Sequence, residues 1–411
     1  MSRPTRTSSH SPVSGRPRRT RVRSALAATA LAAVLATGPA APAFAHAPAA
    51  HDSAGTADTA PRCTSAGALC TAIAGLPGDD ATAALVRVGG KEGTWRGSAG
   101  VHDLTSGRAA DPAARFRAGS VTKVFTAAVV LQLASEHRVS LGRPVRHYLP
   151  DLIPGAYRGV TVRQLLNHTS GLPSSDSAGD SEQEWYEHRF DRYTPHQLVA
   201  SAVAKKPLFA PGTRQKYDNI GYTVAGLLIE RVTHDSYAHQ VTRRILDPLG
   251  LRDSYFPGTA TGIRGPHNHG YQVYRGPGGT SELRDVTEWG QTESWAAGDL
   301  ITSTADLEHF TRALFSGHVV RGPQLSEMFT LPHLRTGTPE YSAGLSVITL
   351  GGRQVWAKTG GRWGYNAVMA ATRDLSRTLV YSVNSTDAKG EDMNPTAMKI
   401  AVAAFGAPPA G

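Results

Sequence analysis

The sequence predicts an α+β protein: one antiparallel sheet built from both ends of the chain and flanked by helices, with a mainly helical lobe inserted between. Six β-rich runs fall into two groups, two before the helical stretch and four after it: 83–88, 94–101, 343–349, 354–358, 366–372 and 378–383. The first two runs are separated by a turn that begins with two glycines and form a predicted hairpin. A cleft between sheet and lobe is the expected place for a functional site.

Helices are predicted from apolar patterns and from their boundary residues. The predicted ranges are 64–74, 120–133, 161–168, 195–204, 220–232, 304–315 and 395–405. The segment 258–279 is rich in glycine and proline and is interpreted as a long surface excursion. We therefore expect one folded domain over 63–408, with the sheet part at about 63–125 and 295–408 and the helical lobe at about 126–294.

Composition indicates a globular protein without a nucleic-acid-binding surface. Of the 411 residues, 40% are hydrophobic and 18% are charged. The formal net charge is +10, but residues 1–45 hold seven arginines and no acidic residue. The remainder carries 36 basic and 33 acidic residues, a net of +3, and shows no basic stripe. Nucleic acid is therefore not an expected partner.

The first 45 residues are typical of a cleaved export signal. Arg16–Arg23 is basic, Ser24–Thr37 is small and apolar, and Ala43–Ala45 fits a small-x-small cleavage site. We expect cleavage after Ala45 and a secreted, extracytoplasmic protein, by either the general or the twin-arginine route. The apolar run has 14 residues, short of the roughly 20 that span a bilayer, so a stable membrane span is not expected in the mature chain. A short membrane anchor is the alternative.

The segment that follows the signal, 46–62, is rich in Ala, Pro, Asp and Thr and is predicted to be a disordered linker. Cys63 and Cys70, the only two cysteines, come directly after it. Export to an oxidising compartment would allow a disulfide between them. Neither cysteine has the neighbouring pattern of a catalytic thiol, so we expect a structural bridge.

The first motif that carries chemistry is Ser120-Val121-Thr122-Lys123, after Gly119 and at the start of an apolar helix. Residues three apart share one face of a helix. A serine hydroxyl becomes nucleophilic when a neighbouring base takes its proton, and a lysine is such a base once burial or nearby positive charge lowers its pKa. The alternative is a capping serine and a solvated lysine.

The second motif is Tyr217-Asp218-Asn219, in a loop before the helix at 220–232. Residues two apart in an extended loop point the same way, so Tyr217 and Asn219 could both enter a cleft. There, a tyrosine beside lysine ammonium groups could pass protons, and the amide could orient a substrate carbonyl or hold Lys123. The alternative is a packed tyrosine and a capping asparagine.

The third motif is Lys358-Thr359-Gly360, at the end of a predicted strand and followed by Gly361 and Arg362. A strand edge that faces a cleft can pair with an extended peptide, and glycine lets the two backbones approach closely. Lys358 would add positive charge opposite Lys123. The alternative is a plain turn between strands.

The three motifs occur once each, in this order, on a helix start, a loop and a strand. Over about residues 75–405 the chain resembles the penicillin-recognising serine hydrolases, the D-alanyl-D-alanine carboxypeptidases and class C β-lactamases. The resemblance extends to 165–172, 222–230 and 294–304, and it is strongest to the secreted soluble carboxypeptidases. It implies a serine β-lactamase/transpeptidase-like fold and a substrate that is a peptidoglycan stem peptide or a β-lactam.

The resemblance also implies a role for each motif residue. Ser120 would be acylated, Lys123 and Tyr217 would share the base and proton-relay role, Asn219 would position the substrate and Lys358 would sustain the electrostatics. The remaining residues would bind substrate: Thr359 at a carboxylate, Gly360 and Gly361 through their backbone, with the Gly361 and Ser120 N–H groups as oxyanion hole, Trp295 lining the cleft, and Arg362. Loss of D-alanine would leave an acyl-enzyme that water hydrolyses.

Three departures from the family pattern bear on the substrate. The soluble carboxypeptidases usually have His-Thr-Gly where this chain has Lys-Thr-Gly, and a polar residue where it has Gly361. They also place an arginine for the terminal carboxylate in the preceding strand, whereas 344–348 contains none, leaving Arg362 as a substitute. A β-lactamase or small-ester hydrolase, and a non-enzymatic binder of β-lactams or muropeptides, therefore stay open.

No cofactor or metal is predicted. His267 and His269 could form a metal pair, but no third ligand is evident, so a surface loop is the better interpretation. His168 is interpreted as a packed or capping histidine. The chain contains neither His-Glu-x-x-His nor Gly-x-Ser-x-Gly, and we expect a monomer.

Overall fold

The computed structural model describes residues 67–176, 179, 181–276, 280–390 and 392–406. The predicted signal at 1–45, the linker at 46–62 and Cys63 lie outside these residues. Cys70 is disulfide-bonded, and the sequence holds only one other cysteine. No helix in the described part of the chain is long and apolar enough to cross a membrane.

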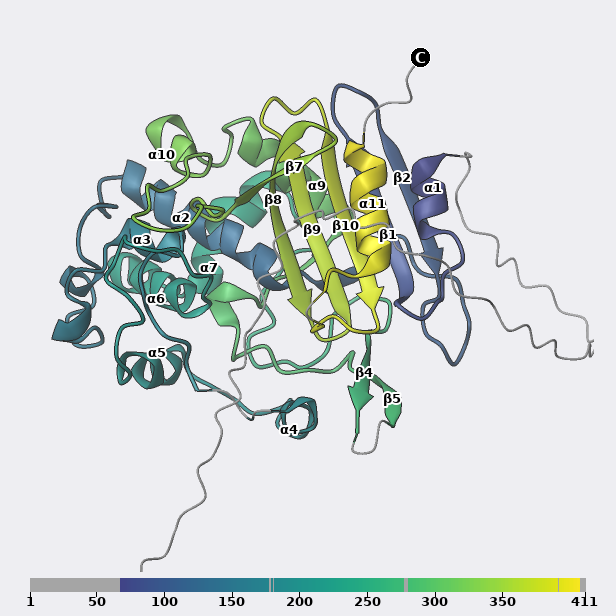
Figure 1. The fold of residues 1–411 in the computed structure, drawn as a ribbon, viewed down its shortest axis with the longest axis horizontal. Helices are drawn as coiled ribbons and strands as arrows, with labels where there is room; N and C mark the ends of the chain where they lie inside the picture. Colours follow the sequence, from purple (N-terminus) through teal and green to yellow (C-terminus); the bar gives the residue numbers. More distant parts are fainter. Residues whose placement is uncertain (1–66, 177–178, 180, 277–279, 391, 407–411) are drawn as a thin grey trace, which may run out of the picture.

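The central sheet has six antiparallel strands in the order β2-β1-β10-β9-β8-β7, so β1 from the start of the chain pairs with β10 from its end (Figure 1). The strands are β1 Ala81–Gly89, β2 Trp95–Gly100, β7 Ser346–Leu350, β8 Arg353–Arg362, β9 Tyr365–Thr372 and β10 Thr378–Ser385. Strand β1 pairs with β10 along nearly its whole length, with Val86 opposite Tyr381. The predicted fold class is confirmed, because one antiparallel sheet contains strands from both ends of the chain and the segment between them is mainly helical.

Helices cover both faces of this sheet. The helices of the described chain, including those of the lobe away from the sheet, are α1 Ala68–Ile73, α2 Thr122–Ser135, α3 Val162–Leu166, α4 Glu182–Glu187, α5 Pro195–Val203, α6 Ile220–Thr233, α7 Tyr237–Val241, α8 Asp247–Leu249, α9 Thr304–Phe315, α10 Gly322–Glu327 and α11 Pro395–Phe405. Figure 1 shows α11 lying across one face beside α1, where Ile73, Ile400 and Phe405 form a small core with the strands. On the other face the larger core gathers around α2, which is buried on nearly all sides.

Two predicted boundaries are wrong in ways that matter for the site. Strand β8 continues to Arg362, so the Lys-Thr-Gly triplet lies inside a strand and not at its end. Strand β7 begins only at Ser346, because Gly344, with φ of 89°, turns the chain against Ala127 of α2.

The predicted surface excursion at 258–279 is also corrected. It contains β4, Tyr271–Arg275, which pairs with β5, Ser281–Asp285, as a separate hairpin below the sheet (Figure 1). A further short pair, β3 Arg115–Arg117 with β6 Ile301–Ser303, ties the segment before Ser120 to the segment before α9. The sequence did not predict this hairpin because the glycines and prolines of 258–279 favour turns over strands.

Candidate active site

Ser120 lies in the 3₁₀ turn Gly119–Val121 that leads into α2, and Lys123 lies one turn further on. The residues at the N-cap positions of this turn and of α2 are Ala118 and Val121, so Ser120 caps neither, which removes the capping alternative. Instead, its Oγ lies 3.1 Å from Lys123 Nζ. Ser120 stays partly exposed, whereas Lys123 has no exposed surface.

Two acceptors fix the amine of Lys123. Its Nζ donates to Asn219 Oδ1 and to the carbonyl oxygen of Ala297, both at 2.8 Å. Burial, followed by the charge of Lys358, lowers the pKa of Lys123 well below its ordinary value, which favours the neutral amine. A neutral amine has two N–H groups and one lone pair; the two oxygens take the N–H groups, so the lone pair is left for the Ser120 hydroxyl.

Tyr217 and Asn219 reach the same point from the loop before α6. Asn219 stands at the N-terminal boundary of α6, but its side chain makes no capping bond, so its amide serves Lys123. The ring centroid of Tyr217 lies 5.0 Å from Lys123 Nζ and 4.8 Å from Lys358 Nζ. Burial raises the pKa of Tyr217 far above its ordinary value, against the opposing effect of the Ser120 hydroxyl. The phenol is therefore neutral, and its oxygen makes no hydrogen bond that meets geometric criteria among the described residues.

The glycines of the third motif bring β8 against the Ser120 turn. A Cβ on Gly360 would lie 1.9 Å from the carbonyl oxygen of Ala118 and 3.0 Å from the backbone nitrogen of Ser120. A Cβ on Gly119, whose φ is 52°, would lie 2.8 Å from the nitrogen of Gly361. This close approach puts the backbone nitrogens of Ser120 and Gly361 on neighbouring segments, as an oxyanion hole requires.

Three further residues singled out from the sequence, Lys358, Thr359 and Trp295, differ from one another in burial and in what they contact. Lys358 is buried, which lowers its pKa to about 7, and Thr359 is exposed. The Trp295 ring packs against Gly226 of α6 and against Tyr237 of α7. Its segment still serves the site, because Ala297 holds Lys123.

Arg362 is buried, at 7% exposure, and its guanidinium makes no ion pair within the described residues. Its Nη2 is 3.5 Å from the carbonyl oxygen of Gly290, and its Nε has no hydrogen-bond partner among the residues that the structure describes. Sequence reasoning missed the neighbouring Lys389, whose Nζ lies 5.4 Å from the ring centroid of Trp363. Burial and the charge of Arg362 lower the pKa of Lys389 to about 8. No sequence pattern marks this lysine, since only the folded sheet brings the segment that follows β10 to the end of β8.

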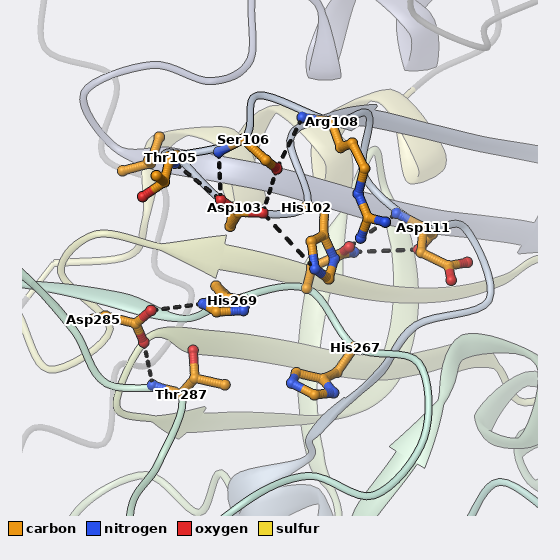
Figure 2. Close-up of polar contacts among 12 residues, drawn as sticks. His102, Asp103, Thr105, Ser106, Arg108, Asp111, His267, His269, Asp285 and Thr287 are labelled. Carbon is orange, nitrogen blue, oxygen red and sulfur yellow. Dashed lines mark hydrogen bonds and ion pairs between the residues drawn. The ribbon is translucent and has the colours of Figure 1, made fainter.

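The histidine pair singled out from the sequence lies in another part of the molecule. Figure 2 shows His267 and His269 near His102, which follows β2. Nδ1 of His269 is 2.6 Å from Asp285 Oδ2, and Nδ1 of His267 is 2.8 Å from the carbonyl oxygen of Gly265. No group of three metal-ligating side chains within the described ranges could hold a metal ion.

The chemistry available at Ser120 is nucleophilic acyl transfer. The serine has within hydrogen-bond reach a buried amine whose pKa is lowered, with a neutral phenol beside that amine and two backbone nitrogens nearby. A base, a proton donor and an oxyanion hole are the parts that this reaction needs.

Comparison with known proteins agrees with this chemistry. Among solved structures, the D-stereospecific amidohydrolase of a Streptomyces species is 33% identical, over 82% of this chain and 98% of that one, with a TM-score of 0.71. The D-amino acid amidase of Ochrobactrum anthropi superposes with a TM-score of 0.66 over 79% of this chain and 92% of that one; at 24% identity it shows the fold alone.

Curated relatives match parts of longer proteins. Protein flp of Staphylococcus aureus is 30% identical over 217 residues, which are 52% of this chain and 41% of the relative. Penicillin-binding protein 4* of Bacillus subtilis is 27% identical over 302 residues, 71% of this chain and 65% of the relative. The chain thus spans less than two thirds of either relative. Residues 65–403 match the β-lactamase family, and the chain belongs to this family of serine hydrolases.

Proposed function

We propose that the protein is an exported serine D-alanyl-D-alanine carboxypeptidase that acts on peptidoglycan stem peptides. One observation carries the hydrolytic part of the proposal: the buried amine of Lys123, held by Asn219 and Ala297, lies 3.1 Å from Ser120 Oγ. The carboxypeptidase part rests on the resemblance of the three motifs to that class of enzyme and on the positive charge beside Gly361.

In the proposed reaction, Ser120 Oγ attacks the carbonyl carbon between the two D-alanines, and its proton passes to the lone pair of Lys123. The oxyanion forms against the backbone N–H groups of Ser120 and Gly361. Tyr217, a neutral phenol beside Lys123, relays the proton to the leaving nitrogen as the C–N bond breaks, and D-alanine departs. Water then attacks the acyl-enzyme with the same groups in reverse roles. A β-lactam would acylate the same serine.

Arg362 and Lys389 support a leaving group that carries a carboxylate. A buried guanidinium is costly unless anions offset its charge. Burial lowers the pKa of Arg362, and Glu293 and Asp299 lie near enough to oppose this without forming an ion pair with it, so a substrate carboxylate would supply a direct partner. The Lys389 segment lies close to the oxyanion residue, since a Cβ on Gly361 would be 3.1 Å from the carbonyl oxygen of Ala388. Both cations also contribute to lowering the pKa of Lys123, which is consistent with positions near the cleft.

A second candidate is amide hydrolysis of a D-amino acid derivative without a terminal carboxylate. The identity of 33% over 98% of the D-stereospecific amidohydrolase favours it, and so does the lack of an arginine in β7. The third candidate function is hydrolysis of a β-lactam or a small ester on the same scaffold. The non-enzymatic alternative is a binding protein that is acylated once.

The test begins with intact-mass analysis after incubation with a fluorescent penicillin. We expect one adduct on wild type and none on Ser120→Ala; equal labelling of both would overturn the nucleophile. D-alanine release from a D-Ala-D-Ala peptide is then compared with ammonia release from a D-amino acid amide, and with hydrolysis of a chromogenic cephalosporin. Faster hydrolysis of the amide would favour the amidase function over the carboxypeptidase function. An adduct on Ser120 without turnover would favour the non-enzymatic binder.

A further inference from the structure

His168 is a fully buried histidine that the acid–base set at Ser120 does not include. It is 2% exposed and has a φ of 61°, in the left-handed region that residues other than glycine seldom adopt, although histidine does so more often than most. Its ring centroid lies 4.4 Å from that of Tyr217. Backbone strain beside a reactive group indicates that the surrounding structure requires this residue to be held there.

Hydrogen bonds join the His168 turn to the loop that carries Tyr217. The backbone nitrogen of Lys216 donates to the carbonyl oxygen of His168 at 3.0 Å. The nitrogen of Asp218 donates to His168 Nδ1 at 3.3 Å, and Gln215 Nε2 donates to the carbonyl oxygen of Asn167 at 2.7 Å. Tyr217 is thus held on both sides, by a backbone bond before it and by the imidazole bond after it.

The second of these bonds fixes the protonation of the imidazole. Because the Asp218 N–H points at Nδ1, that nitrogen must carry a lone pair, and the proton of the neutral ring must be on Nε2. Burial lowers the pKa of His168, and Lys123 and Lys358 add to this, while the carboxylate of Asp218 opposes it. A proton on Nδ1 would face the Asp218 N–H and break the bond.

We propose that His168, as a neutral imidazole with its proton on Nε2, is a positioning residue for acylation of Ser120. Through Nδ1 it holds the backbone of Asp218 and so sets the places of Tyr217 before it and Asn219 after it. Asn219 holds the amine of Lys123, so the imidazole acts on Ser120 through Asp218, Asn219 and Lys123. The inference rests on the proposed acyl-enzyme function.

The other groups around the ring do not replace this bond. The ring centroids of Tyr222 and Tyr341 lie 5.4 and 5.2 Å from that of His168, and the Tyr222 hydroxyl donates to the carbonyl oxygen of Leu166. The Asp218 carboxylate is 3.8 Å from Nδ1, and its Oδ1 accepts from the nitrogen of Gly221 at 2.6 Å. The imidazole is therefore the group that receives the Asp218 N–H.

Two substitutions separate the hydrogen bond from the bulk of the ring. The side-chain oxygen of His168→Asn can take the place of Nδ1, whereas that of His168→Gln reaches the place of Nε2; neither residue titrates. His137 provides matched controls, because it is an exposed histidine with a φ of 58°. The pair His137→Asn and His137→Gln measures the cost of each residue in a left-handed backbone.

Acylation of Ser120 by a fluorescent penicillin is the readout, at equal folded fraction. We expect His168→Asn to stay within about tenfold of wild type and His168→Gln to be slower by about 100-fold, the loss typical of a misplacement near 1 Å. Equal acylation rates for the two His168 variants, whether reduced or at the wild-type level, would overturn the proposal. No acylation of wild type would instead refute the proposed function.

The protonation state is tested on wild type alone, should the variants fail to fold. Neutron diffraction from crystals at neutral pH shows ring protons directly. A hydrogen on Nε2 only supports the proposal, and a hydrogen on Nδ1 overturns it.

Discussion

At the scale of single residues, the reactivity of Ser120 depends on the surroundings of one amine. Lys123 has no exposed surface, and its two protein acceptors, Asn219 Oδ1 and the Ala297 carbonyl, are uncharged oxygens. An uncharged acceptor binds an N–H group without stabilising the ammonium as a carboxylate would. This combination lowers the pKa of Lys123 and so favours its action as a base.

Asn219→Asp tests that argument. A carboxylate 2.8 Å from Lys123 Nζ would stabilise the ammonium and raise the pKa of Lys123. We expect the acid side of the acylation–pH profile to move to higher pH. A rise of one pKa unit lowers the fraction of neutral amine about tenfold, so acylation at pH 7 should be slower by about tenfold or more. Asn219→Ala removes the acceptor without adding charge. Equal midpoints for the two variants would contradict the argument.

Lys358 makes stability depend on pH. Its pKa is lowered from 10.5 to about 7, so between these values the unfolded chain binds a proton that the folded protein lacks. The free energy of unfolding therefore rises with pH across this window, by about 1.4 kcal/mol per pH unit for one such group. Lys358→Met should reduce the slope by that amount.

Urea unfolding at pH 7.5, 8.5 and 9.5 measures this slope for wild type and Lys358→Met. Lys206→Met, at an exposed lysine, controls for the loss of a surface charge. Parallel pH dependences for wild type and Lys358→Met would show that the lysine carries no such penalty.

At the scale of elements, the site depends on the contact between β8 and the turn before α2. Apolar patterning predicted α2 and the strand, but not that the strand runs on to Arg362. The triplet and the glycines after it have weak strand propensity; they are held in the sheet by pairing with β9, in which Gly360 lies opposite Ala367.

Gly360→Ala should abolish most activity at moderate cost in stability. The added methyl would lie 1.9 Å from the Ala118 carbonyl oxygen, a backbone atom that cannot turn aside, so β8 and the Ser120 turn must separate. We expect acylation to slow by about 100-fold or more. Gly159→Ala is the control, because a Cβ there meets nothing within 4 Å. Near-wild-type acylation by Gly360→Ala would mean that the close approach is dispensable.

At the scale of the whole molecule, both ends of the chain are needed to complete one sheet. Strand β1 lies between β2 and β10, and α11 covers the face that these strands share with α1. Such a fold closes only after the last strand is available, so we expect the site and the terminal helix to unfold together.

Phe405→Ala tests this coupling. Phe405 is 1% exposed in the core beneath α11, and its truncation should lower the free energy of unfolding by about 3–5 kcal/mol. Val402 on the same helix is 53% exposed, so Val402→Ala should change it by less than about 0.5 kcal/mol. Urea transitions followed by circular dichroism and by Ser120 labelling should coincide for Phe405→Ala. Separate transitions would show that the site folds without α11.

The sequence by itself determined the fold class, the order of the elements and the three motifs, because hydrophobic period and motif spacing are local properties of the chain. Only the tertiary structure decided that the Asn219 amide faces Lys123 and not its own helix. It also placed Ala297, His168 and Lys389 around the motifs. These placements depend on contacts between residues far apart in sequence, such as Lys123 and Ala297. Burial in the common interior, rather than residue type, lowers the pKa values of Lys123, Lys358 and Lys389.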